Sequence, residues 1–201
     1  MFTMENFADK IVANEWGYGT WKDDGPALNQ LPLEWSLVNA RARGVISYGQ
    51  LNEQSPKRLY RMFALEALVS GVTPWPASSE AFELWAPLRR VDVEKFVFAD
   101  WRNPAVVLGN DRCASAIYSR PQESYIVIGN LTGAAQNVHF RLFPEKLPCP
   151  MANPGIVTLV HEGSGRETNV LASRLDIRQL LGDGIPLTLP PDGTLWLKIQ
   201  P

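Results

Sequence analysis

A carboxylate stands among aromatic side chains near the start of the chain, in the segment FADKIVANEWGYGTW of residues 7–21. Glu15 follows an apolar run that is typical of a buried strand, and Asn14, Trp16 and Trp21 lie close to it in the sequence. A carboxylate presented at the end of a strand is a candidate general acid, general base or nucleophile. Neighbouring aromatic faces favour a sugar as its ligand, because they attract polarised C–H groups and bury apolar area.

Each of these residues has an alternative role. Glu15 acts as a catalytic carboxylate, contacts a sugar hydroxyl, or pairs with an arginine in a structural role. The nearby aromatic residues form either a sugar-binding platform or a cover for the rim of the domain. Glycosidases usually use two carboxylates, and the candidates for the second one in this sequence are Asp23, Asp24 and Glu53, or a residue outside the chain.

Polar and aromatic residues also follow two later apolar runs. Gln50, Asn52 and Glu53 follow VISY at 45–48, and Trp75 ends the run VTPW. If these runs are parallel strands, their carboxyl ends meet at one edge of the sheet. We therefore predict one site there, with Glu15 as the catalytic residue and a substrate-binding set made of Asn14, Trp16, Trp21, Gln50, Glu53 and Trp75.

The first hundred residues alternate strand-like and helix-like patterns. We predict strands at 10–14, 45–48 and 72–75 and helices at 33–43, from 55 to Gly71, and at 80–90. The middle helix has the clearest signal, because its apolar residues recur at helical spacing: Tyr60, Phe63, Ala64, Ala67 and Leu68. Strands that alternate with helices favour a parallel sheet covered by helices.

The pattern changes after about residue 91 to short runs rich in β-branched and aromatic residues. Val138, Phe140 and Leu142 alternate with polar residues, which is typical of a strand buried on one face. NLTG at 130–133 is interpreted as a hairpin turn, and PPDG at 190–193 as a tight turn before the last strand. The sequence thus predicts an α/β domain at 1–96 and an antiparallel β-sandwich at 97–201.

Three βα units leave a parallel sheet with unpaired edges. One interpretation is a small three-layer α/β domain that is complete as it stands. The other is the end of a TIM-type barrel, which closes with eight such units. The segment KIVAN at 10–14 is apolar in its middle and carries no blocking proline. This favours a missing neighbouring strand, and hence the last three or so βα units of a barrel followed by a sandwich.

Five segments, in order, resemble the C-terminal end of bacterial glycoside-hydrolase-like proteins: FADKIVANEWGYG, RMFALEALVSGVTPW, FELWAPLRRVDVEKFVFADWRNPAVV, SYIVIGNLTGAAQNVHFRL and LTLPPDGTLWLKI. The resemblance implies a (β/α)8 barrel followed by a C-terminal β-sandwich. It implies hydrolysis of O-glycosidic bonds by acid/base carboxylates, with a carbohydrate substrate and no organic cofactor. It also implies that the first five or so barrel strands are missing. They would form a partner portion without which this chain is inactive.

Composition excludes several other classes of function. The 201 residues carry a formal net charge of −2, which gives no reason to expect nucleic acid or an anionic membrane as a partner. The N-terminal residues do not form a secretory signal, although the cellular compartment stays open. The two cysteines, Cys113 and Cys149, are either free thiols or a pair, with free thiols favoured. The histidines and cysteines lack zinc-site spacing, so no metal site is expected.

A non-enzymatic module that binds carbohydrate or another protein is the alternative function. In a third interpretation the sandwich only covers one side of the barrel. Trp85 and Trp101 are predicted in a core between the two domains, and His139 on the solvated face of a strand. His161 begins a turn and has no serine or cysteine partner that would make a catalytic triad.

Overall fold

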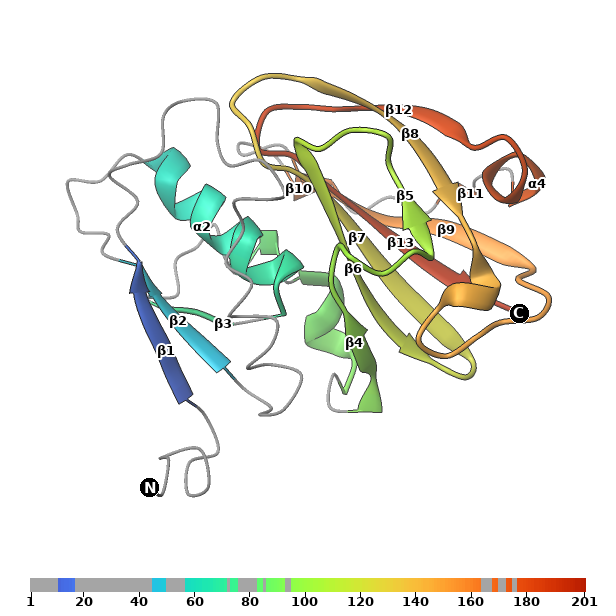
Figure 1. Cartoon of the computed structure of the whole chain (residues 1–201), viewed down its shortest axis with the longest axis horizontal. Coiled ribbons are helices and arrows are strands. Elements are labelled where there is room, and N and C mark those ends of the chain that lie inside the picture. The colour runs from blue at the N-terminus through green and yellow to red at the C-terminus, as the bar shows by residue number, and fades with distance from the viewer. Residues whose placement is uncertain are drawn as a thin grey trace.

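The computed structural model describes residues 11–16, 45–49, 57–71, 73–75, 83–84, 86–92, 95–163, 168–169, 173–174 and 177–201. Figure 1 shows a small sheet and one long helix beside a larger body of strands. Within the described part of the chain, no helix is long and apolar enough to cross a membrane.

The N-terminal strands form a parallel sheet, as predicted. Strands β1 (Ile11–Trp16), β2 (Val45–Gly49) and β3 (Thr73–Trp75) lie in the order β1-β2-β3, and both strand pairs are parallel. Helix α2 (Lys57–Val69) connects β2 to β3. Gly71 follows this helix with a φ of 71°, a left-handed conformation that glycine adopts without steric cost. The predicted helix at 33–43 lies outside the described residues.

The helix predicted at 80–90 differs from the structure. Residues 83–84 are helical, but Ala86–Arg90 form the 3₁₀ helix η4. Pro87 explains the difference, because its ring clashes with the carbonyl four residues earlier and it has no N–H to donate. The chain therefore tightens into a 3₁₀ turn there.

The C-terminal part is an antiparallel β-sandwich, as predicted, and the strand pairs among its described residues are antiparallel. The larger sheet has the order β10-β9-β13-β7-β6-β4, with β11 also paired to β9. Its strands are β4 (Val97–Ala99), β6 (Cys113–Arg120), β7 (Glu123–Asn130), β9 (Ile156–Gly163), β10 (Thr168–Asn169), β11 (Ser173–Arg174) and β13 (Thr194–Gln200). The smaller sheet has the order β12-β8-β5, from β5 (Val106–Val107), β8 (Gln136–Leu142) and β12 (Ile185–Leu189). The described part of the sandwich domain also contains two short helices, η6 (Pro144–Lys146) and α4 (Ile177–Leu181).

The segment NLTG is not a hairpin turn, which corrects the prediction. Strand β7 pairs with β6 and β13, whereas β8 pairs with β5 and β12, so residues 130–133 carry the chain from one sheet to the other. The Asn130 side chain directs this crossing. Its Oδ1 accepts a hydrogen bond from the backbone N–H of Thr132 at 2.9 Å, and its Nδ2 donates one to the carbonyl of Pro190 at 2.8 Å. The predicted tight turn at 190–193 is confirmed by a 3.0 Å hydrogen bond from the Gly193 N–H to the Pro190 carbonyl.

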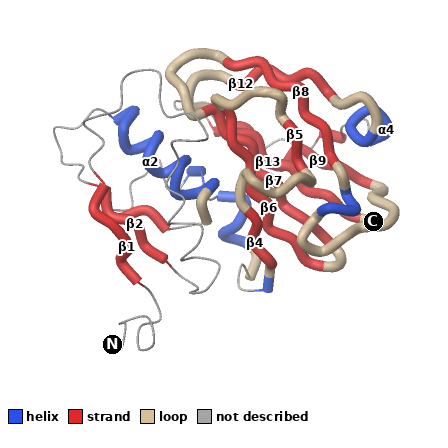
Figure 2. The backbone as a smooth tube through the Cα atoms, viewed as in Figure 1, coloured by secondary structure: helices blue, strands red, loops and turns tan. Residues whose placement is uncertain are grey.

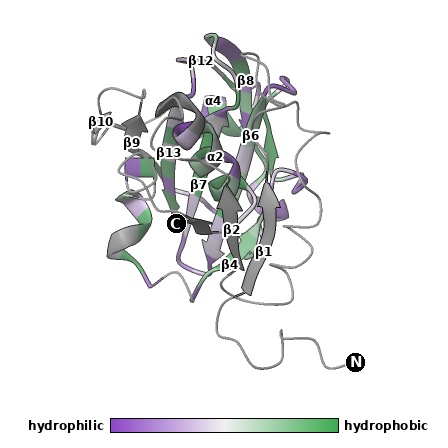
Figure 3. Ribbon diagram, turned by 90° about the vertical axis from the view of Figure 1, so that its left-hand side faces the viewer, coloured by the Kyte–Doolittle hydropathy of each residue, from purple (hydrophilic) through white to green (hydrophobic). Residues whose placement is uncertain are grey.

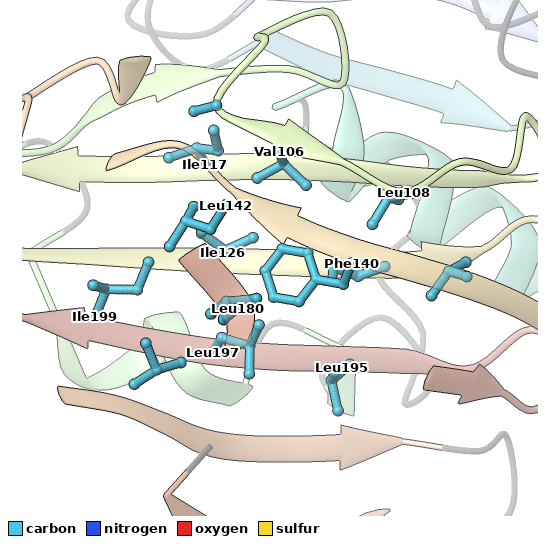
Figure 4. Close-up of a cluster of buried hydrophobic side chains, with 14 of the residues drawn as sticks. Val106, Leu108, Ile117, Ile126, Phe140, Leu142, Leu180, Leu195, Leu197 and Ile199 are labelled. Carbon is cyan, nitrogen blue, oxygen red and sulfur yellow. The ribbon is translucent and has the colours of Figure 1, made fainter. Parts of the chain in front are cut away.

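One face of the larger sheet packs on the smaller sheet. We call this cluster the inner core; its buried members include Ile117, Ile126, Ile128, Phe140, Leu142, Leu195, Leu197 and Ile199. Figure 4 shows Phe140 of β8 near the centre of this cluster, with the side chains of Leu142, Ile126 and Leu197 around it. Strand β8 alternates buried and more accessible residues, so it is buried on one face as its sequence predicts.

The opposite face of the larger sheet packs on α2. We call this second cluster the seam; it contains Ala64, Leu65, Leu68 and Val69 of α2, Leu84, Leu88 and Phe96, and Ala114, Ala116, Tyr118, Tyr125, Val127, Leu131 and Trp196. Figures 2 and 3 show α2 lying against the sandwich strands. Trp101 packs against the seam, as predicted for a core between the two parts, whereas Trp85 lies outside the described residues.

Polar groups and one glycine position the helix in the seam. The Arg61 Nε donates to the Asp192 carbonyl at 2.8 Å, and the Trp196 Nε1 donates to the Leu84 carbonyl at 2.9 Å. Gly129 allows the close approach, since a Cβ there would lie 2.4 Å from the Cδ1 atom of Leu65. The α/β part and the sandwich are therefore held in a fixed relation by buried contacts. The exact division at residue 96 stays a prediction.

Candidate functional site

The carboxyl ends of the three parallel strands lie at one edge of the sheet. Register places Glu15 of β1 opposite Tyr48 of β2, and Tyr48 opposite Trp75 of β3. We call these three residues the Glu15 row. Neighbouring strands lie about 4.8 Å apart, so a carboxyl-bearing, a phenol-bearing and an indole-bearing residue follow one another across roughly 10 Å of backbone.

A β-bulge precedes Glu15. Ala13 pairs with Ser47 and Glu15 pairs with Tyr48, so Asn14 is an extra residue with no partner of its own on β2. Trp16 then pairs with Gly49. A bulge bends its strand and changes the direction of the residues around it, and bulges are frequent beside active sites. The irregularity therefore falls at the residue pair for which the sequence predicts chemistry.

The described backbone contains four of the seven predicted site residues: Asn14, Glu15, Trp16 and Trp75. Trp21, Gln50 and Glu53 lie outside the described residues, as do Asp23 and Asp24, the other candidates for a second carboxylate. The assembly of all seven into one site stays a prediction.

Tyr48 also belongs to this edge, although its sequence pattern does not mark it as a site residue. The pattern predicts only that Tyr48 ends the strand VISY and that the polar segment begins at Gln50. The available signal was an aromatic hydroxyl at a strand end, but only the register shows that it stands between Glu15 and Trp75.

A charged cluster in the sandwich is structural. Glu123 forms ion pairs with Arg120 and with Lys198, the latter at 2.8 Å. Burial disfavours the ionised carboxyl, but the hydrogen bond and charge of Lys198 and the charge of Arg120 outweigh it, so the pKa of Glu123 is lowered. Arg120 also lies 4.8 Å from the centre of the Phe96 ring. Each charged group of the cluster is paired with an opposite charge, which is typical of a stabilising cluster at the end of a hairpin.

The two cysteines are free thiols, as predicted. Burial, with a contribution from Asp111, raises the pKa of Cys113 to about 12, so this thiol is not an activated nucleophile. Cys149 is half-buried, and its Sγ donates to the Ser119 carbonyl at 3.5 Å. Among the residues that the structure describes, no group of three or more histidine, cysteine, aspartate or glutamate side chains is placed to hold a metal ion.

Two hollows on the described surface of the sandwich are candidate ligand sites. The larger, of about 640 Å³, lies beside Phe143, Met151 and Leu181. Arg141 and Lys146 approach the Phe143 ring to 4.7 and 4.3 Å from its centre, so the ring is engaged by cations and is not a free platform for a sugar. The smaller, of about 290 Å³, is lined by Trp101, Val107 and Cys113 among others.

His139 is exposed, as predicted, and its ring contacts the Asp183 carbonyl.

Neither a protein-family model nor a curated protein matches the sequence. Several solved structures of glycoside hydrolases are similar to it over part of their length. A family 30 subfamily 8 xylanase from Clostridium acetobutylicum matches with a TM-score of 0.50 and 12% identity, over 96% of this chain and 49% of that one. A family 30 endoxylanase from Clostridium papyrosolvens matches with a TM-score of 0.49 and 11% identity, over 94% and 49%. An α-amylase from Geobacillus thermoleovorans matches with a TM-score of 0.48 and 13% identity, over 84% and 42%.

The match with the Clostridium acetobutylicum xylanase shows a likeness of fold to part of that enzyme. Because the sequence identity is only 12%, this match is evidence for a similar fold and not for a shared activity. The chain spans about half the length of the xylanases it matches.

Proposed function

We propose that these residues are the C-terminal part of a glycoside-hydrolase-like protein that hydrolyses O-glycosidic bonds. The last βα units of its barrel carry part of the active site, and the sandwich covers one side of the barrel. The substrate is a carbohydrate. The remaining barrel strands form the portion that completes the catalytic domain.

The observation that carries this proposal is the position of Glu15 at the carboxyl edge of a parallel sheet, beside a β-bulge and in register with two aromatic residues. In (β/α)8 enzymes the active site forms at this edge, from residues at the ends of several strands. The likeness of fold to a xylanase over 96% of the chain supports the same architecture.

In this proposal Glu15 is one of two carboxylates that flank the scissile bond. One carboxyl group protonates the leaving oxygen, and the other acts as nucleophile or activates water. Asn14 and Trp16, with Trp75 across the sheet, bind the sugar beside it, as do Trp21, Gln50 and Glu53 from the segments that follow. The second carboxylate comes from one of those segments or from the upstream barrel portion.

The test is hydrolysis of a panel of 4-nitrophenyl glycosides and polysaccharides by the native protein, whatever its length. Glu15→Gln removes the charge and keeps the shape, and is expected to lower kcat by about 10³-fold or more on the substrate that the native protein cleaves. Glu145→Gln is the matched control, because Glu145 is exposed on the sandwich. This control is expected to leave kcat unchanged.

Two results would contradict the proposal. One is native protein that cleaves no glycoside in the panel. The other is a Glu15→Gln variant as active as the Glu145→Gln control. Binding of a polysaccharide without turnover, unaffected by Glu15→Gln, would instead support the non-enzymatic binding module.

A further inference from the structure

The larger hollow of the sandwich takes no part in the proposed function. Its volume of about 640 Å³ lies within the range of small-molecule sites, which is roughly 300–1,000 Å³. Its walls are mostly apolar and include the buried side chains of Leu142 and Met151, Leu181 of α4 and the rings of three prolines. Figure 1 shows α4 at the end of the molecule away from β1, so this hollow is separate from the carboxyl edge of the parallel sheet.

The loop that forms most of the hollow, residues 143–154, is held in place by the sandwich. The Phe143 N–H donates to the Ala105 carbonyl at 2.8 Å, and the Cys149 N–H donates to the Oγ atom of Ser119 at 3.2 Å. Four of the twelve loop residues are proline, which fixes φ at those positions. Because the backbone is fixed in advance, a ligand that enters the hollow has little of the chain to order.

Two cations stand beside the aromatic residue of the lining. The Arg141 guanidinium carbon lies 4.7 Å from the centre of the Phe143 ring, and the Lys146 ammonium nitrogen lies 4.3 Å from it. Neither cation forms an ion pair with another residue that the structure describes, and this includes Glu145, the exposed acidic residue of the lining. The hollow therefore combines apolar walls with two positive charges that no described carboxylate neutralises.

We propose that this hollow binds a small amphipathic organic anion. Its apolar body fills the space beside Met151 and Leu181, and its carboxylate, or an equivalent anionic group, pairs with Arg141, with Lys146 as a second positive charge beside it. A guanidinium suits this role because it binds a carboxylate through two parallel N–H···O bonds. An uncharged sugar fits less well, because cations already engage the Phe143 ring on which it would stack.

The test is the binding of 2-naphthoate to the native protein, measured by isothermal titration calorimetry. The neutral comparison compound is 2-naphthalenemethanol, which has the same ring system. We expect 2-naphthoate to bind about tenfold more tightly than the neutral compound, since only the anion makes a charge-assisted hydrogen bond. Its affinity is expected to fall as the salt concentration rises, because ions screen the exposed cations.

Variants locate the site. Arg141→Gln is expected to weaken the binding of 2-naphthoate about tenfold, and Lys146→Gln to weaken it by a smaller factor. Both residues are exposed, so these variants are expected to fold, which circular dichroism checks. Lys95→Gln is the matched control, because it removes one positive charge from an exposed residue outside the hollow, and it is expected to leave the affinity unchanged.

Three results would each overturn the inference. They are the absence of 2-naphthoate binding, equal binding of the neutral compound, and equal affinity of the Arg141→Gln and Lys95→Gln variants for 2-naphthoate. The inference is independent of the glycosidase function, because none of the seven predicted site residues lines this hollow.

Discussion

The two faces of the larger sheet bury different kinds of surface. The inner core is mainly aliphatic, and Phe140 is the one aromatic side chain among its buried described members. The seam contains Phe96, Tyr118, Tyr125 and Trp196, whose rings pack in pairs, such as Tyr118 and Trp196 with centroids 6.0 Å apart. The inner core joins strands of one domain, whereas the seam joins the sandwich to α2, Leu84 and Leu88 of the α/β part.

This difference indicates how the two parts hold together. Aromatic side chains with a polar group bury a large area and also make a directional bond at the partner surface. Trp196 and Tyr118 do so, with the carbonyls of Leu84 and Leu68 as acceptors at 2.9 and 3.4 Å. Burial raises the pKa of Tyr118, so its hydroxyl keeps its proton and stays a donor. A sandwich without α2 would expose these rings, so we infer that the two parts fold as one unit.

The largest expected effect is the difference in the free energy of unfolding between a variant in the seam and a variant on the surface. Trp196→Ala removes a fully buried indole and is expected to lower the free energy of unfolding by about 3–5 kcal/mol, measured by urea denaturation. Gln122→Ala, at an exposed position in the turn between β6 and β7, is expected to stay within about 0.5 kcal/mol of the parent chain. A Trp196→Ala chain as stable as the Gln122→Ala chain would show that the seam contributes nothing to folding.

A smaller effect tests the close approach of α2 to the sheet. Gly129→Ala places a methyl group against Leu65 and is expected to destabilise the fold by about 1–3 kcal/mol through overpacking. Leu65→Ala in the same chain creates the space for that methyl group. The double variant should therefore lose less stability than the sum of the two single variants. Strict additivity in urea denaturation would mean that residues 65 and 129 do not touch.

Much of this arrangement was predictable from local sequence patterns. The apolar spacing in 60–68 predicted α2, and alternation in 136–142 predicted a strand with one buried face. Long-range contacts were not predictable, because nothing near Gly129 in the sequence indicates that Leu65 packs on it. The hairpin expected at 130–133 failed for a related reason, since the Asn130 side chain bonds the Pro190 carbonyl, 60 residues away.

The candidate site shows the same limit. Glu15 and Trp75 were identified from their residue types at strand ends, but the bulge at Asn14 and the place of Tyr48 depend on register, which a single sequence does not specify.

The smallest expected effect concerns the charged cluster at the hairpin end of the larger sheet. The pKa of Glu123 is lowered in the folded state, so its ion pairs stabilise the fold above the ordinary glutamate pKa of about 4.5. This contribution is lost as the pH falls through the lowered pKa. In Glu123→Gln, the free energy of unfolding should fall less between pH 6 and pH 3 than in the parent chain. Parallel pH profiles of urea denaturation would contradict the role assigned to Glu123.

We propose above all that these residues form one part of a larger glycoside-hydrolase-like protein. The most direct test is the intact mass of the native protein from its source cells, with peptide mapping upstream of Met1. We expect a species much heavier than 22.4 kDa, with peptides that precede Met1. A native species of 22.4 kDa, with no peptide upstream of Met1, would contradict the claim.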